Sequence, residues 1–278
     1  MKNYLKGKSI IITGAASGFG QLVAQKTAEM GANVTAADIN ADGLAETVAS
    51  VKDKDGKVQS VIADVTKFGD MQTVAAKAIE AYGAVDIILN NAGTMPLAFY
   101  ADHEAAIEQW HKCVDINFKG VVNGIACVFD HMMGREEGHV INLSSIFGNF
   151  PVAGSNVYGA TKVAVTFLSE SLRVEAAGKI KVTVIKPTGV MNTGLFHSMV
   201  NPAAAVGIVG HNGANQQAIM DKLMSGTAEP DHLNPDSSKY VALDAGYVAD
   251  QIVYAMNQPK GVSVSDITVR ATGDQYIL

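Results

Sequence analysis

Short apolar runs rich in β-branched residues alternate along this chain with longer stretches in which apolar residues recur at helical spacing. Apolar runs with few polar positions are typical of strands that helices cover on both faces. The pattern predicts strands at 9–13, 33–37, 58–63, 85–89, 140–143, 180–185 and 266–269. It predicts helices at 19–30, 42–51, 71–82, 104–133, 157–177 and 245–256.

This alternation over the whole length indicates βαβ units, and therefore an α/β fold with a parallel sheet of about seven strands. We find no internal repeat, so we expect one domain over 1–278. The one long stretch without a regular pattern, 187–242, is rich in Gly, Asn, Pro and Met. Loops of that length inside a compact domain are usually functional. We therefore expect 188–242 to cover a substrate.

Composition narrows the classes of function. The 278 residues include 21 Lys plus Arg against 27 Asp plus Glu, so the basic excess that binds nucleic acid is missing. No run of about 18 apolar residues predicts a membrane span, and the N-terminal residues do not resemble a signal peptide. Cys113 and Cys127 lie too far apart on one predicted helix to pair, which indicates a cytoplasmic protein. The seven histidines lack the spacing of a metal site.

A glycine-rich turn follows the first predicted strand and opens the first helix. Its pattern is Gly14-x-x-x-Gly18-x-Gly20. Gly14 allows a tight turn, Gly18 lets the backbone approach a pyrophosphate, and Gly20 permits close packing of helix on strand. The N–H groups at the start of the helix are free to bind phosphate oxygens. Because such a turn can also be only a tight connection, its position in the chain carries the prediction of a dinucleotide site.

Asp38 ends the second predicted strand, where a carboxylate can accept hydrogen bonds from both hydroxyls of the adenosine ribose. The same carboxylate would repel a 2′-phosphate, and neither 15–17 nor Ile39 supplies a Lys or Arg to bind one. These residues predict NAD(H) in preference to NADP(H). The alternative is an Asp that only starts a turn or caps the next helix.

Tyr158 and Lys162 are four residues apart on a predicted helix, which places both side chains on one face. The phenol pKa of about 10 is too high for acid–base work at neutral pH. A neighbouring ammonium, and the positive charge of an oxidised nicotinamide, would lower the pKa of the phenol. Taken alone, the pair could equally be a surface pair that arose by chance.

Together these motifs resemble the short-chain dehydrogenase/reductase family over nearly the whole chain. The resemblance rests on the glycine turn, Asn90-Asn91-Ala92-Gly93 after the fourth strand, Asn117, Ser145 and Tyr158-x-x-x-Lys162, all in the family's order. It implies a Rossmann-type doubly wound sheet with helices on both faces. It also implies an NAD(H)-dependent oxidoreductase that interconverts a secondary alcohol and a ketone by direct hydride transfer.

The resemblance assigns four catalytic residues. Tyr158 would be the general acid in ketone reduction and the general base in alcohol oxidation. Lys162 would lower the pKa of Tyr158 and hold the nicotinamide ribose. Ser145 would bind the substrate oxygen, whereas the adjacent Ser144 would point the other way along an extended strand. Asn117 would anchor a water that relays protons from Lys162 to solvent.

Further cofactor contacts follow from the same resemblance, including an adenine contact at Asp64 and Val65 and a nicotinamide contact after the sixth strand. In that last segment Thr188 stands where the family has Gly, and Asn192 takes the usual place of a Thr that here lies one residue later. We therefore leave the carboxamide contact open between Asn192 and Thr193. The full set of predicted cofactor residues is Gly14, Ser17, Gly18, Phe19, Gly20, Asp38, Ile39, Asp64, Val65, Asn91, Ala92, Gly93, Tyr158, Lys162, Pro187, Gly189, Val190 and Thr193.

The substrate and the partners are less defined. Methionines with Leu195 and Phe196 give the covering segment an apolar character, which favours a largely apolar alcohol or ketone. In the family the counterparts of the helix 104–133 and of the helix that carries Tyr158 pair with a second copy, which implies a dimer or tetramer. The alternative function is a catalytically silent NAD-binding regulatory protein, which would not need Ser145, Tyr158 and Lys162 together.

Overall fold

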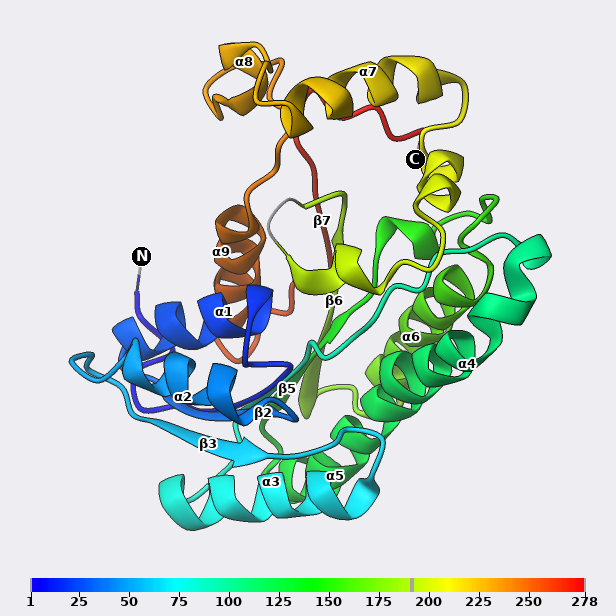
Figure 1. Ribbon diagram of the computed structural model, residues 1–278. Helices are drawn as coiled ribbons and strands as arrows, with labels where there is room; N and C mark the ends of the chain where they lie inside the picture. Colours follow the sequence, from blue (N-terminus) through cyan, green and yellow to red (C-terminus); the bar gives the residue numbers. More distant parts are fainter. Residues whose placement is uncertain (1, 191–192, 278) are drawn as a thin grey trace.

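Seven parallel strands form one twisted sheet in the computed structural model, which describes residues 2–190 and 193–277 (Figure 1). The strand order is β3-β2-β1-β4-β5-β6-β7, and every neighbouring pair is parallel. This confirms the predicted α/β class and its doubly wound sheet. The strands are β1 (Ser9–Thr13), β2 (Asn33–Asp38), β3 (Val58–Ile62), β4 (Ile87–Asn90), β5 (Gly138–Leu143), β6 (Ile180–Pro187) and β7 (Asp266–Val269).

Helices cover both faces of the sheet, which is why its central strands are apolar without alternation. In β1, Ile10 and Ile12 point into one core cluster and Ile11 points into the other, and all three are fully buried. The first cluster receives side chains from α1 (Gly18–Glu29), α2 (Ala41–Ala49) and α9 (Ala245–Met256). The second receives them from α3 (Phe68–Tyr82), α5 (Gly120–Arg135) and α6 (Asn156–Glu175).

The order of the strands reverses direction between β1 and β4, since β2 and β3 lie on one side of β1 while β4 to β7 extend the other side. Ligands of open α/β sheets bind at such a switch point, outside the carboxyl ends of the strands. The glycine turn after β1 and the segment 91–93 after β4 both lie at this edge. The topology therefore brings the two motifs together.

The predicted helix 104–133 is wrong in one respect, because it is not a uniform α-helix. It consists of α4 (His103–Val114), a π-helical segment at Asp115–Lys119, and α5. The apolar spacing runs through all three, so periodicity alone could not reveal the extra residue in the π turn. Single π turns in helices are frequent at functional sites.

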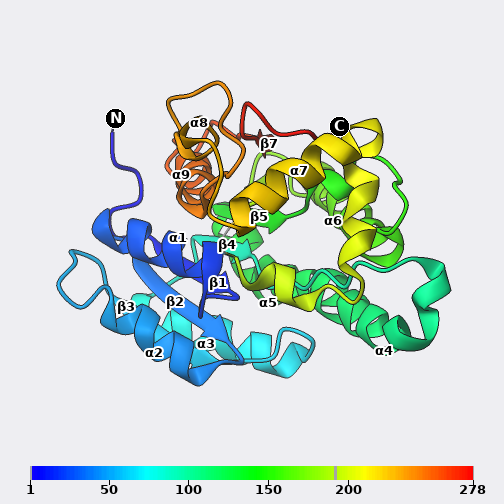
Figure 2. The same ribbon diagram turned by 45° about the horizontal axis from the view of Figure 1, so that its top comes forward.

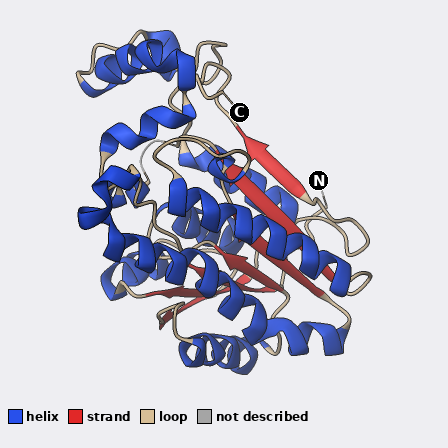
Figure 3. Ribbon diagram, turned by 90° about the vertical axis from the view of Figure 1, so that its right-hand side faces the viewer, coloured by secondary structure: helices blue, strands red, loops and turns tan. Residues whose placement is uncertain are grey.

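The segment 187–242 contains more regular structure than we expected. Its described residues, 187–190 and 193–242, hold three 3₁₀ segments, Gly194–Ser198, Pro202–Ile208 and Gly210–Asn212, followed by α7 (Gly213–Met224) and α8 (Pro230–Leu233). The α7 helix escaped prediction because it has no clear apolar stripe. Figure 1 shows α7 and α8 as a lobe that stands beyond the ends of the strands. In Figure 2 this lobe is turned toward the viewer, and Figure 3 gives a side view of the molecule coloured by helix and strand.

Candidate active site

The turn between β1 and α1 has the geometry that a phosphate group needs. Gly14 and Gly18 have φ angles of +66° and +54°, a backbone region that residues other than glycine rarely adopt. A Cβ on Gly18 would meet nothing within 4 Å, so the backbone there faces open space. Ser17 precedes the helix without a side-chain cap, which leaves the first N–H groups of α1 available. These features fit the pyrophosphate of a dinucleotide.

Gly20 allows α1 to pack closely against the turn, as predicted. A Cβ on this residue would lie 2.2 Å from the carbonyl oxygen of Gly14, so any side chain would push the helix away from the turn. Phe19, next to it, is half-buried and packs against the core cluster beneath α1.

Asp38 ends β2 beside this turn. Its Oδ2 accepts a hydrogen bond from the Ala16 N–H at 3.1 Å, and its Oδ1 accepts one from the Asn40 N–H at 3.0 Å. The carboxylate thus helps to hold the turn, and its remaining lone pairs are free for ribose hydroxyls. Ile39 follows with 69% of its surface exposed and brings no positive charge.

Asp64 and Val65 lie after β3 and hold their own loop. Asp64 Oδ1 accepts hydrogen bonds from the Thr66 N–H at 3.0 Å and the Thr66 hydroxyl at 2.7 Å. Burial acts to raise the pKa of Asp64, but these bonds outweigh it and the pKa is lowered. The Val65 carbonyl accepts a hydrogen bond from Asn123 at 2.8 Å. The adenine contact stays a prediction.

The segment after β4 joins the glycine turn to the predicted acid–base groups. Asn91 Nδ2 donates to the carbonyls of Thr13 and Gly14 at 2.9 and 3.0 Å, and the Ala92 N–H donates to the Thr13 hydroxyl at 3.2 Å. A Cβ on Gly93 would lie 3.3 Å from Asn117 Oδ1 and 3.9 Å from Lys162 Nζ. One short segment therefore spans the distance from the phosphate turn to Lys162.

The structure brings Ser145, Tyr158 and Lys162 together. Tyr158 and Lys162 project from α6, and Lys162 Nζ lies 5.6 Å from the centroid of the Tyr158 ring. Ser145 follows β5 and its hydroxyl is hydrogen-bonded to the Tyr158 phenol. All three are at most 6% exposed. The adjacent Ser144 donates instead to the Lys162 carbonyl at 2.9 Å, so the two serines do point in different directions.

The proton affinities in this cluster differ from our expectation. Burial raises the pKa of Tyr158 well above its usual value, and the hydrogen bond from Ser145 offsets only part of that rise. Burial lowers the pKa of Lys162 to about 8. The expected acidification of the phenol by Lys162 is therefore wrong for the protein alone. The physical reason is that both groups have lost water and that Lys162 Nζ donates to the Leu143 carbonyl, at 2.9 Å.

Asn117 lies in the π-helical segment and is 1% exposed. Its side chain is fully engaged, since Oδ1 accepts from the Thr94 N–H and Nδ2 donates to the Thr94 carbonyl, both at 2.9 Å. Nδ2 also lies 3.3 Å from the Thr161 hydroxyl, which donates to the Tyr158 carbonyl at 2.7 Å. Asn117 thus connects the segment after β4 to α6, and the water relay at this residue stays a prediction.

The segment after β6 contains Pro187 as the last strand residue, buried Val190, and Thr193 immediately before the 3₁₀ turn Gly194–Ser198. Asn192 lies outside the described residues, so the choice between Asn192 and Thr193 stays open. The Thr188 hydroxyl is buried and has no hydrogen-bond partner among the residues that the structure describes. Gly189 is packed against Tyr276 from the end of the chain, a contact that no local pattern in the sequence could indicate.

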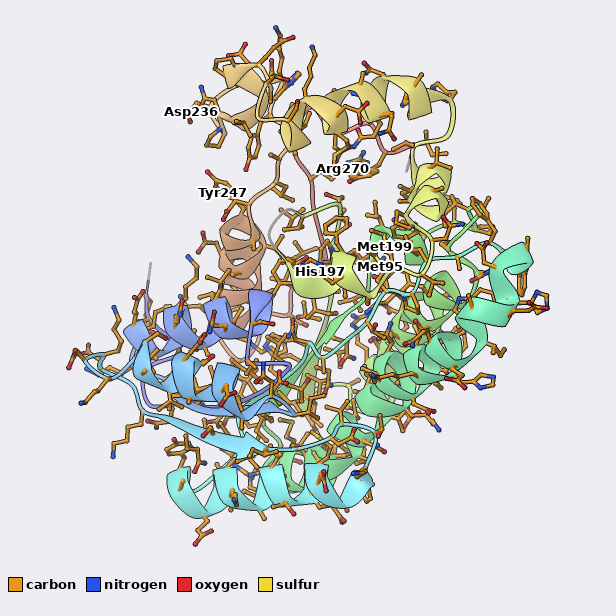
Figure 4. The ribbon with its side chains drawn as sticks, viewed as in Figure 1. Met95, His197, Met199, Asp236, Tyr247 and Arg270 are labelled. Atoms are coloured by element: carbon orange, nitrogen blue, oxygen red, sulfur yellow. The ribbon has the colours of Figure 1, made fainter. Side chains whose placement is uncertain are left out.

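An apolar cluster adjoins the Tyr158 ring. It combines residues after β4 with residues of the covering segment, and Figure 4 shows Met95, His197 and Met199 near one another at this place. Its members include Met95, Leu97, Phe99, Phe147, Leu195, Met199 and Ala204.

Two kinds of feature are absent from residues 2–190 and 193–277. No group of three or more His, Cys, Asp or Glu side chains there is placed to hold a metal ion. None of the helices in these ranges has the length and apolar character that would let it cross a membrane.

Comparison with known proteins identifies the family. Residues 8–203 match the family model of the short chain dehydrogenases. An uncharacterized oxidoreductase of Listeria monocytogenes is 34% identical over 275 residues, which cover 98% of this chain and 99% of that relative.

Solved structures agree. A short chain dehydrogenase/reductase of Burkholderia phymatum in complex with NAD is similar with a TM-score of 0.74 and 26% identity, covering 96% of this chain and 90% of that one. A closed form of serine dehydrogenase complexed with NADP⁺ is similar with a TM-score of 0.76 and 28% identity, covering 96% and 97%. The chain therefore belongs to the short-chain dehydrogenase family of oxidoreductases.

Proposed function

We propose that this oxidoreductase interconverts a secondary alcohol and a ketone with NAD(H), and that Tyr158 transfers the proton. The observation that carries the proposal is the convergence of Ser145, Tyr158 and Lys162 at the carboxyl edge of the sheet, next to the glycine turn. When bound, the nicotinamide supplies or accepts the hydride. The protein's own residues orient the substrate carbon and manage the proton.

In ketone reduction, Tyr158 donates its phenolic proton to the substrate oxygen while Ser145 donates a second hydrogen bond to the same oxygen. The raised pKa of Tyr158 keeps the phenol protonated before reaction, as a general acid requires. In the reverse direction the phenol must lose its proton, and a positive charge beside the ring is what makes that possible. In the protein alone the Lys162 ammonium, 5.6 Å from the ring centroid, does not bring the pKa of the phenol below its usual value. We therefore assign the additional charge to the oxidised nicotinamide when it is bound.

Lys162 and Asn117 support that step. Lys162 Nζ holds the Leu143 carbonyl and lies beside Gly93, where it can also reach the hydroxyls of a nicotinamide ribose. Asn117 bonds Thr94 in the segment after β4 and Thr161 on α6, which holds that segment against the helix that carries Tyr158 and Lys162. We propose that the π turn at Asn117 is the place where a proton passes between Lys162 and solvent.

The preference for NAD(H) rests on Asp38. Its carboxylate is fixed at the end of β2 by two backbone N–H groups and carries a negative charge to where a 2′-phosphate would lie. The similar structures include one complex with NAD and one with NADP⁺, so they favour neither cofactor. The proposed preference for NAD(H) therefore depends on the Asp38 carboxylate alone.

The substrate that fits best has a largely apolar body, because the cluster beside Tyr158 is lined by Met95, Met199 and their apolar neighbours. We propose that 188–242 covers this substrate, since Leu195, Met199 and Ala204 already pack in the same cluster. The free thiols of Cys113 and Cys127 support a reducing, cytoplasmic location.

We also propose that the chain pairs with a second copy through α5 and α6. These helices form a groove of about 400 Å³ between them, lined by Val122, Ile125, Phe129 and Leu168 among others. On α6, Phe167 and Val174 are 77% and 79% exposed. Apolar side chains so exposed along one face are typical of interfaces between subunits.

The experiment is a spectrophotometric assay of NADH and NADPH oxidation with a panel of apolar ketones. The proposal predicts turnover that is faster with NADH than with NADPH at equal concentrations. Faster turnover with NADPH would refute the cofactor preference, and no turnover of any ketone would refute the assigned reaction.

A further inference from the structure

The last residues of the chain, 270–277 (the C-terminal tail), are fastened to the covering segment, although chain ends usually fray unless they are tied down. Asn212 Nδ2 donates to the Gln275 carbonyl at 3.0 Å, and the Ile277 N–H donates to the Ile208 carbonyl at 3.1 Å. Arg270 pairs with Asp274 and donates to the Tyr276 carbonyl at 3.0 Å. The backbone of Tyr276 is thus anchored on both sides.

This anchoring places the Tyr276 side chain at the carboxyl end of β6. A Cβ on Gly189 would lie only 1.6 Å from the Tyr276 hydroxyl, so the phenol occupies the space that a side chain at 189 would need. The ring also packs in a cluster with Ile146, Ile208 and Val209. Ile146 directly follows Ser145, so the phenol lies between the residue that binds the reacting oxygen and the segment after β6. Figure 4 labels Arg270 at the start of this tail, beneath α7.

The Tyr276 side chain is half-buried, and its hydroxyl lacks a hydrogen-bond partner in the part of the chain that the structure describes. It makes no hydrogen bond to any residue there, while its neighbours in the tail make several. Burial raises the pKa of Tyr276 to about 12, so the phenol is neutral and can donate. Thr188, which precedes Gly189, carries a buried hydroxyl that has no hydrogen-bond partner among residues 2–190 and 193–277. Buried polar groups such as the Thr188 hydroxyl normally have partners. A half-buried phenol without a hydrogen bond next to it, at the end of β6, points to a polar ligand atom there.

We propose that Tyr276 is a specificity-determining residue that donates a hydrogen bond to a second polar atom of the substrate, separate from the reacting carbonyl oxygen. This inference rests on the proposed function and narrows its substrate class. The favoured substrate is a ketone with an apolar body and one additional oxygen, such as a diketone or a hydroxyketone. A site built to hydrogen-bond such an oxygen discriminates strongly against the analogue that lacks it.

The test compares wild type with Tyr276→Phe on matched probes, 1,2-cyclohexanedione against cyclohexanone and 2,3-pentanedione against 2-pentanone, with NADH. We expect wild type to favour the dione of each pair by about tenfold or more in kcat/KM. Tyr276→Phe should lose this preference, while its kcat/KM for the monoketones stays within about threefold of wild type. Tyr254→Phe, which removes the hydroxyl of a partly exposed tyrosine on α9, should behave like wild type.

Two readouts separate the failure of this inference from the failure of the proposed function. The first is the Kd for NADH, which Tyr276→Phe should leave unchanged. A raised Kd, or an equal loss on both members of each pair, would overturn the inference, as would a wild type that favours neither dione. The second is calorimetric binding of 1,2-cyclohexanedione to protein saturated with NAD⁺. If no carbonyl is turned over, the proposed function fails, and equal binding by wild type and Tyr276→Phe would then reject the inference as well.

Discussion

Burial shifts the proton affinities of the two central side chains in opposite directions. It raises the pKa of Tyr158 and lowers the pKa of Lys162 to about 8, because each neutral form is favoured away from water. A phenol that stays protonated suits the reduction of a ketone. A lysine that changes its charge near neutral pH suits a proton relay. Both shifts also make the stability of the fold depend on pH.

We predict that Lys162 makes the folded protein more stable as the pH rises above 8. Its folded pKa of about 8 lies below the ordinary value of 10.5, so between these values the unfolded chain binds more protons than the folded one. From about pH 7.5 to about pH 9.5 this contributes about 2 kcal/mol to the free energy of unfolding. The raised pKa of Tyr158 acts in the other direction only above its ordinary value of about 10.

The measurement is urea unfolding of wild type, Lys162→Met and Lys52→Met at those two pH values. Lys52 is exposed and serves as the matched control. Wild type and Lys52→Met should gain the same stability on going to high pH, and Lys162→Met should gain about 2 kcal/mol less. An equal gain in all three proteins would show that Lys162 is not titrating as described.

Among the elements, the first turn of α1 is where the proposed cofactor site depends most on one residue type, glycine at position 18. Gly18 and Gly178 both have positive φ angles, and a Cβ on either would meet nothing within 4 Å. The cost of the strained backbone is therefore similar at the two positions, about 1 kcal/mol. Only Gly18 lies where we place the pyrophosphate, so the pair separates binding from stability.

We predict that Gly18→Ala raises the Kd for NADH by about tenfold or more, since the methyl group enters the space of the phosphates. Gly178→Ala should leave the Kd for NADH unchanged. It should lower the thermal midpoint of unfolding by about as much as Gly18→Ala does. Fluorescence titration with NADH, together with thermal unfolding, checks both variants. If the two alanines affect NADH binding equally, the turn is only a structural connection.

The sequence predicted most helices and strands of the fold, but not all of them. The alternation of apolar runs and helical spacing was enough for the sheet and for its helices, because both faces of the strands are buried and leave a strong signal. The π turn at Asn117 was missed because one extra residue does not change the apolar spacing around it. The α7 helix was missed because it buries no stripe. The contact of Tyr276 with Gly189 joins residues far apart in the sequence, so no local signal exists.

In the candidate site, the sequence predicted the positions of side chains better than their chemical properties. The spacing of Tyr158 and Lys162 predicted that both side chains share one face of a helix, because helical geometry fixes which residues lie together. That Ser145 joins them came from the family resemblance and not from the spacing. Spacing could not give the proton affinities, since these depend on the burial of both groups and on their hydrogen bonds to Ser145 and to the Leu143 carbonyl. Asp38 illustrates an intermediate case. Its Oδ1 accepts from the Asn40 N–H, as an Asp that starts a turn would, and its Oδ2 accepts from the Ala16 N–H of the glycine turn. The contact with a ribose stays a proposal.

At the scale of the whole molecule, the exposed face of α5 and α6 predicts self-association. Phe167→Asp would place a charge in the interface at a residue that is 77% exposed in the single chain, so folding should survive while pairing is lost. Ile62→Asp, at the 68% exposed end of β3, is the control. Light scattering should report a dimer or larger for wild type and Ile62→Asp, and a single chain for Phe167→Asp. A wild type with the mass of one subunit would contradict the proposed interface.

The central claim is that the Tyr158 phenol transfers the proton beside a bound nicotinamide. The most direct measurement is NADH oxidation by wild type and Tyr158→Phe with the best ketone of the panel, with NADH binding followed by fluorescence. We predict a loss of turnover of about a thousandfold or more with the Kd for NADH within about threefold of wild type, because only the proton donor is removed. Turnover that persists in Tyr158→Phe at a tenth of wild type or more would contradict the account.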